Sequence, residues 1–224
     1  MKFNNLALGT SLIVILVACK ATFPNSKKQR KEKAYWESLV SQPSTDSAIK
    51  GYWVELIDGR WDYFEKKGID LAEKDVSALK FIKLLSYTID SIGLSNYNGL
   101  RSLSSFLTLD KNDIVTFAVK NGAIVAMIYP RFENGKWINA KGYGVPFQPV
   151  ANAIYEIAKS GGEVYNVKVI AFPGSKTVTR QCLITNKNRQ LMSIGSDGKL
   201  RPFDDELMAI KKDVMKTASE EKSH

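Results

Sequence analysis

The spacing of hydrophobic residues changes about half-way along the chain. In the first half apolar residues recur at helical spacing, whereas in the second half they gather in short runs rich in β-branched side chains. Two of these runs flank Asn121 and Gly122, a pair typical of a tight hairpin turn. The second half predicts six strands, over 114–119, 123–129, 136–141, 163–172, 177–185 and 189–194.

Helical spacing is clearest from Ile49 to Phe64, where the apolar residues all fall on one face of a helix. Asp58 and Gly59 lie in the middle of this stretch, so we interpret it as two helices with a break at Gly59. The alternative is a β-hairpin in which Asp58 and Gly59 form the turn.

Three further helices are expected. The first starts at Asp75 and has a buried side of Val76, Leu79, Ile82, Leu85 and Ile89. Residues 91–105, rich in Ser, Asn and Gly, follow it as a long connection. The other two helices begin at Pro149, which suits a first helical turn, and at Asp204.

The order of these elements is helices, three strands, helix, three strands, helix. It predicts an α+β domain with a mostly antiparallel sheet of about six strands, N-terminal helices, one inserted helix and a C-terminal helix. The helices are expected on one face of that sheet. The folded domain is expected to span 34–217, and residues 218–224 to form a disordered tail.

Two loose family resemblances agree with an α+β fold. A tryptophan-bearing helix, broken at Asp58 and Gly59 before another aromatic helix, resembles NTF2-like domains. A helix between two triplets of strands is similar to profilin-like and roadblock-like sheets. Neither resemblance assigns the body to a family, so each implies a fold class and no specific activity.

The first nineteen residues have the organisation of a secretion signal. Lys2 gives a positive start, and residues 6–18 form an uncharged apolar run of thirteen residues. That run is too short for the ~20 residues of a membrane-spanning helix. It ends in an aliphatic residue, a tolerant position, a small residue and a cysteine: Leu16, Val17, Ala18 and Cys19.

This ending resembles the lipobox of bacterial lipoprotein precursors. The resemblance implies transfer of diacylglycerol to the Cys19 sulfur, cleavage after Ala18 to remove the signal peptide 1–18, and acylation of the new amino terminus. The mature chain would be residues 19–224, held in the bilayer by its lipid. In a Gram-negative host, Lys20 in place of an aspartate implies the outer membrane, facing the periplasm. An ordinary cleaved signal and an uncleaved anchor are the alternatives.

Most of the net charge of +9 belongs to residues 20–33, a polar segment interpreted as a tether. Six basic residues and Glu32 give the tether +5; with Lys2 set aside, +3 remains for residues 34–224. Because the body has no broad basic excess, nucleic acid is not expected as a partner. The tether has almost no apolar periodicity and is expected to add little to folding. Its cations are candidate contacts for anionic lipids at ~1 kcal/mol each: Lys20, Lys27, Lys28, Arg30, Lys31 and Lys33.

Few residues suited to catalysis or metal binding are present. One histidine, His224, and two cysteines exclude hydrolysis by a histidine base, zinc sites of several histidines and cysteine-rich zinc modules, and no cofactor is expected. Two S-x-x-K sequences, 47–50 and 77–80, lack the companion motifs of penicillin-recognising enzymes. Four carboxylates share one helix face, an arrangement compatible with acid–base chemistry but typical of a polar outer surface: Glu55, Asp58, Asp62 and Glu65.

Two features of the second half bear on recognition and reactivity. Tyr143, Val145 and Phe147, between a strand and a helix, are candidate partner-binding residues, with a lid packed back on the core as the alternative. Cys182 has the strand parity of Ile184, which predicts a buried, unreactive thiol. An exposed Cys182 that forms an intermolecular disulfide is the alternative.

These features predict a non-enzymatic lipoprotein of the bacterial cell envelope. Its expected partners are the bilayer, through Cys19, and an envelope protein for which the body acts as a binding or assembly module. One alternative is an envelope enzyme that cleaves glycan or peptide with carboxylates, which a perturbed acidic pair in a cleft would favour. Another is a carrier of a small apolar ligand, which a large closed apolar pocket would favour.

Overall fold

The computed structural model describes residues 27–66, 71–99, 103–138, 143–144, 147–170, 180–187 and 190–220. Its helices are α1 (Lys27–Val40), α2 (Pro43–Lys66), α3 (Glu73–Val76), α4 (Ser91–Asn96), α5 (Gln148–Lys159) and α6 (Phe203–Glu220), with a 3₁₀ turn at Leu103–Ser105. Its strands are β1 (Lys80–Ile89), β2 (Thr108–Lys120), β3 (Ala123–Ile128), β4 (Arg131–Glu133), β5 (Lys136–Ile138), β6 (Tyr143–Gly144), β7 (Val164–Val169), β8 (Arg180–Lys187), β9 (Gln190–Ile194) and β10 (Leu200–Pro202).

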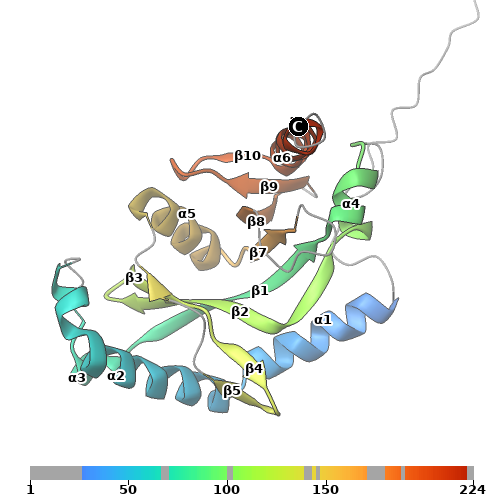
Figure 1. Cartoon of the computed structure of the whole chain (residues 1–224). Helices are drawn as coiled ribbons and strands as arrows, with labels where there is room; N and C mark the ends of the chain where they lie inside the picture. Colours follow the sequence, from blue (N-terminus) through green and yellow to red (C-terminus); the bar gives the residue numbers. More distant parts are fainter. Residues whose placement is uncertain are drawn as a thin grey trace, which may run out of the picture.

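The ten strands form a large mixed sheet (Figure 1). Eight of them follow the order β10-β9-β8-β7-β1-β2-β3-β6, while β4 pairs with β2 and β5. Within the described residues, β1 and β7 are the only parallel neighbours. The predicted fold class, a mostly antiparallel sheet of about six strands, is therefore wrong. Part of the reason is that β4, β6 and β10, which were not predicted, have only two or three residues each, too few to show a period.

Strand β1 is the largest difference from the predicted elements. The helix expected from Asp75 is limited to α3, and residues 80–89 are a central strand between β2 and β7. Tyr87 and Ile89 are buried on one face of the sheet and Leu84 on the other. A strand buried on both faces has a nearly continuous apolar run, so its period does not distinguish it from a helix.

Helices cover both faces of the sheet, not one as expected. One group of buried side chains joins the strands to Trp36 of α1, Trp53 of α2 and Phe203 of α6. A second group joins Phe117 of β2 to Ile154 of α5. Figure 1 shows α5 on the opposite side of the sheet from α1 and α2. Because successive side chains of a strand point to opposite faces, apolar residues on both faces require a cover on each.

Several predicted elements are confirmed. β2 and β3 form the hairpin around Asn121 and Gly122, whose φ angles of 51° and 78° are those that a two-residue hairpin turn requires. α5 and α6 occupy the positions predicted from Pro149 and Asp204. β7, β8 and β9 match the last three predicted strands with shifted bounds. The strand expected over 136–141 is shortened to β5, which pairs with β4.

Helix α2 runs without interruption through Gly59, so neither the predicted break nor the alternative hairpin forms. Ile49, Trp53 and Ile57 are buried along one side of this helix. A glycine inside a helix costs about 1 kcal/mol relative to alanine. Burial of this apolar side offsets that cost, because each large apolar side chain contributes about 1.5–3 kcal/mol when fully buried.

The first helix begins inside the segment predicted as a tether. Residues 27–33 form the first turns of α1. Nζ of Lys33 donates to the Tyr165 hydroxyl at 3.0 Å and lies 3.3 Å from Oε1 of Glu163. Residues 27–33 therefore belong to the folded domain, and the rest of the predicted tether lies outside the described residues. At the other end, α6 extends to Glu220, into the predicted tail.

Removal of residues 27–33 is expected to destabilise the domain. A chain that starts at Ala34 loses the first turns of α1 and the ion pair between Glu32 and Lys111 (3.3 Å). We expect its unfolding free energy to be about 2 kcal/mol lower than that of a chain starting at Lys27. For a domain of this size, Tm falls by roughly 4–8 °C. Circular dichroism during heating measures the difference, and equal melting temperatures would contradict the prediction.

Candidate functional site

Of the three predicted partner-binding residues, only Phe147 has a side chain within the described part of the chain. Phe147 immediately precedes α5 and is 66% exposed, so it does not pack on the core as the lid interpretation requires. The backbone of Tyr143 pairs with Ile128 of β3. Val145 and the side chain of Tyr143 lie outside the described part of the chain.

The exposure of Phe147 follows from how α5 begins. Pro149 lies in the first turn, where its fixed φ suits a helix start and its missing N–H leaves no bond unmade. From there Ala151 and Ile154 face the sheet. Phe147 lies one position before the helix, with φ −59° and ψ 131°, and its ring is left in solvent beside the helix start.

The six predicted membrane-contact residues do not share one environment. Lys20, like the predicted lipidation site Cys19, lies outside the described residues. Lys33 faces the sheet, and its side chain is only 15% exposed. The other four are exposed along α1: Lys27, Lys28, Arg30 and Lys31.

Lys33 is part of a half-buried cluster at the start of β7. Its ammonium contacts Glu37 (3.2 Å), Glu163 (3.3 Å) and the Tyr165 hydroxyl (3.0 Å), and that hydroxyl donates to Glu163. Burial lowers the pKa of Lys33, but the two carboxylates raise it by more, so the pKa lies above its ordinary value. Burial and then Glu163 raise the pKa of Tyr165. Because its charge is paired within the fold, Lys33 is not available as a membrane contact.

A cleft of about 300 Å³ opens beside this cluster, between the C-terminal ends of α1 and α5. It exists because β1 and β7 diverge there: their parallel pairing begins only at Ser86 and Asn166, although both strands start earlier. Apolar and charged side chains line the cleft, among them Val40, Lys83, Leu84, Glu163 and Val164.

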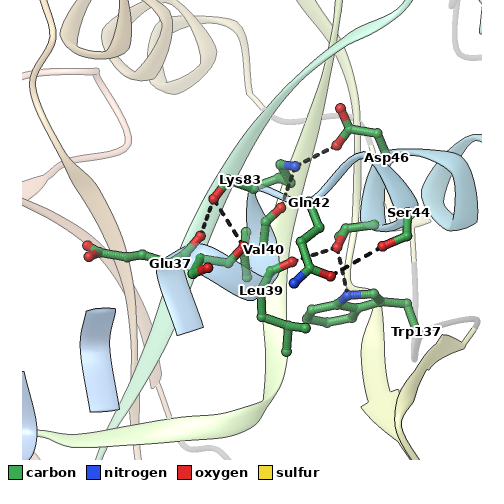
Figure 2. A network of polar contacts seen from close by, with 11 residues as sticks. Glu37, Leu39, Val40, Gln42, Ser44, Asp46, Lys83 and Trp137 are labelled. Atoms are coloured by element: carbon green, nitrogen blue, oxygen red, sulfur yellow. Dashed lines mark hydrogen bonds and ion pairs between the residues drawn. The ribbon is translucent and has the colours of Figure 1, made fainter. Parts of the chain in front are cut away.

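Lys83 in this cleft holds the turn between α1 and α2, as Figure 2 shows. Its Nζ donates to the carbonyl oxygen of Val40, the last residue of α1, and to Oδ1 of Asp46 in the first turn of α2, each at 2.5 Å. On the α2 side, Oγ1 of Thr45 accepts a hydrogen bond from Nε1 of Trp137 at 3.1 Å. These contacts from β1 and β5 fasten the turn between α1 and α2 to the sheet.

A second charged cluster lies on the α5 side of the sheet. Nζ of Lys168 is 2.9 Å from Oδ2 of Asp110 and 2.6 Å from Oδ2 of Asp113, and all three side chains are less than one-fifth exposed. Beside it the Asn166 amide donates to Oγ of Ser86 at 2.9 Å. Burial lowers the pKa of Lys168, but the two aspartates raise it by more, so the pKa lies above its ordinary value. One lysine between two aspartates, all with little exposure, is typical of an ion group that stabilises the fold.

An irregularity in β2 brings these two aspartates together. Leu85 of β1 is opposite Ile114 of β2, but the next residue, Ser86, is opposite Asp110, so the intervening residues bulge from the ladder. In a regular strand, residues three positions apart point to opposite faces. The bulge allows Asp110 and Asp113 to meet one lysine, and no local sequence signal indicates it.

The carboxylates suggested for acid–base chemistry do not share one described pocket. Glu55 lines a pocket of about 200 Å³ beside Trp137, and Asp58 is exposed. The side chains of Asp62 and Glu65 lie outside the described part. Among the described residues, no group of three or more His, Cys, Asp or Glu side chains is arranged for a metal ion. None of the described helices has the length and apolar content needed to cross a bilayer.

The prediction that Cys182 is buried is confirmed. The residue is 5% exposed on β8, and its Sγ lies 3.5 Å from Oε1 of Glu206 on α6. It borders a groove of about 600 Å³ whose rim includes Arg180 and Arg201.

The comparisons with known proteins yield no relative. No protein-family model matches this chain, and no match was found among curated proteins or solved structures. The resemblances to lipoprotein precursors, NTF2-like domains and profilin- or roadblock-like sheets therefore stay predictions.

Proposed function

We propose that this chain is a lipid-anchored protein of the bacterial cell envelope whose folded body acts as a protein-binding module. The supporting observation is the order of features along the chain. The lipobox-like sequence ends at Cys19, and the exposed basic start of α1 follows eight residues later, at Lys27. Eight residues span at most about 28 Å. With lipid on Cys19, the start of α1 is confined near the membrane.

Support for a protein partner comes from the exposed ring of Phe147. Exposed aromatic side chains held beside a rigid element are frequent among the residues that dominate binding energy. The helix that follows Phe147 lies on the opposite side of the sheet from α1 (Figure 1). In the proposed arrangement, one side of the body is close to the membrane and the other is presented to a second envelope protein.

The anchor is tested by intact-protein mass spectrometry of the membrane-extracted chain. We expect residues 19–224 with diacylglycerol on the Cys19 sulfur and an acyl group on its amine. Cys19→Ala should abolish lipidation completely and leave the chain unprocessed or free of lipid. Cys182→Ala is the matched control and should be lipidated normally, because that thiol is buried in the body. A mature protein that retains residues 1–18, or carries an unmodified Cys19, would contradict the proposal.

The same membranes test the protein-binding part of the proposal. A photocrosslinking amino acid at position 147 should give one discrete adduct with an envelope protein. The same group at position 92 is the control, since Ile92 is as exposed as Phe147 (68% and 66%). Adducts of equal yield at both positions, or none at position 147, would count against a partner site at Phe147.

A further inference from the structure

The outer side of α1 presents four residues that the packing of the helix leaves in solvent. At 100° per residue they fall within an arc of about 100°. This arc lies opposite the side on which Trp36 and Val40 are buried. We call these residues the α1 stripe: Lys27, Lys28, Lys31 and Tyr35.

Charges on the inner and outer sides of α1 differ in their pairing. On the inner side, Lys33 is paired with Glu163, and Glu32 with Lys111. Within the described residues, the three lysine side chains of the α1 stripe have neither an ion pair nor a hydrogen bond. The described part of the domain therefore does not neutralise these three cations, which can meet a counter-charge outside it.

Tyr35 adds an aromatic ring to these cations. It is 61% exposed, and its ring lies edge-on against Trp36 with the ring centroids 5.7 Å apart. A tyrosine combines an apolar ring with a polar hydroxyl and is enriched where a bilayer meets water. Lysines and an aromatic residue on one helix face are typical of surfaces that bind anionic membranes.

We infer that the α1 stripe docks on the anionic phospholipid headgroups of the membrane that holds the anchor, so that α1 lies along the bilayer surface. The inference takes the nearness of that membrane from the proposed lipidation of Cys19, eight residues before Lys27. Charge complementarity identifies the ligand as a phosphate-bearing lipid surface. Because α5 lies on the other side of the sheet (Figure 1), docking turns Phe147 away from the bilayer and toward a partner.

The test uses the whole mature chain without lipid, residues 19–224 with Cys19→Ser, and measures its binding to vesicles. We expect binding to vesicles containing one-third phosphatidylglycerol and none to pure phosphatidylcholine. The triple variant K27Q/K28Q/K31Q should bind about 100-fold more weakly. Tyr35→Ala should weaken binding about fivefold, since an aromatic ring is lost from the interface. Raising salt from 0.1 M to 1 M should remove the effect of the lysines, because the Debye length falls from ~10 Å to ~3 Å.

A matched triple variant separates the α1 stripe from net charge. K159Q/K187Q/K199Q removes three exposed lysines from α5, β8 and the β9–β10 turn. It lowers the net charge by the same three units and should bind as the parent chain does. Equal weakening of the two triple variants would overturn the inference, since binding would then depend on total charge.

Orientation is tested on the lipidated chain in the same anionic vesicles. An environment-sensitive fluorophore on Ser38→Cys, which is exposed on the stripe side of α1, should shift to the blue. The same fluorophore on Ile92→Cys should not shift. If Cys19 carries no lipid but the α1 stripe binds vesicles, the proposed function fails and this inference stands. If Cys19 is lipidated but neither the stripe variants nor the fluorophore respond, the inference fails alone.

Discussion

Replacement of Lys168 by methionine is expected to lower the free energy of unfolding by about 3–5 kcal/mol. Methionine is nearly as long as lysine but removes the ammonium group that contacts Asp110 and Asp113, whose side chains are only 18% and 16% exposed. Removal of one partner from a buried ion group is costly because the remaining carboxylates are shielded from water and have lost a close counter-charge. Urea denaturation at neutral pH measures the change.

Two variants separate the charge of Lys168 from its packing. K168M/D110N/D113N removes all three charges and should recover most of the lost stability. Lys159→Met, exposed on α5, should change stability by less than about 0.5 kcal/mol. If Lys168→Met is less stable than K168M/D110N/D113N, the remaining carboxylate charges account for the loss. If Lys168→Met is as stable as the parent chain, the charge of Lys168 has no role in stability.

The pH dependence of this effect has a defined sign. Burial lowers the pKa of Lys168, but the two aspartates raise it by more, so in the folded state it lies above 10.5. A raised folded pKa means that the folded state holds the proton more tightly than the unfolded chain does. The contribution is therefore fully present below pH 10.5 and is lost as pH rises through the folded pKa. The stability difference between the parent chain and Lys168→Met should be constant at neutral pH and shrink in strong alkali.

Cys182 should react with a water-soluble thiol reagent about a thousandfold more slowly in the folded protein than in denaturant. Burial, followed by the nearby Glu206, raises the pKa of its thiol from 9.0 to about 12. At pH 8 the fraction of Cys182 present as the reactive thiolate then falls from roughly one-tenth in the unfolded chain to about 10⁻⁴ in the folded protein. Reaction of the Cys19→Ser chain with a chromogenic disulfide measures both rates.

An exposed cysteine provides the control for the Cys182 experiment. Ser38→Cys on α1 should react at nearly the same rate in the folded and denatured states. Because the folded pKa of Cys182 is raised, the folded state holds the thiol proton more tightly, and stability should decrease as pH rises above about 9.0. Equal labelling rates for Cys182 in the two states would contradict its burial in β8.

The features that the sequence predicted correctly have signals within a few neighbouring residues. Asn121 and Gly122 tolerate positive φ, which defines the β2–β3 hairpin. Pro149 marks the start of α5. The alternation of Cys182 with Ile184 places both on the buried side of β8. Local sterics and side-chain period decide these features, so no knowledge of the neighbouring elements is needed.

Elements whose identity depends on their surroundings were predicted wrongly. Residues 80–89 have apolar spacing that fits a helix, and they form a strand because β2 and β7 pair with its two edges. The shortest strands exist for a similar reason. An isolated pair of two- or three-residue strands is not stable in water, so β4, β6 and β10 depend on neighbours that the local sequence does not identify.

By itself, the sequence determined the lipobox-like ending at Cys19, the excess of cations after it, and the local hairpin and helix signals. Only the tertiary structure decided which cations remain outward: Lys33 turns to Glu163, 130 positions away, whereas the lysines of the α1 stripe do not. The ion group of Lys168 likewise joins residues at least 55 positions apart. The hydrophobic period shows which side of an element is buried, but the partner that buries it, and the ion pairs beside that partner, follow from the packing of distant segments.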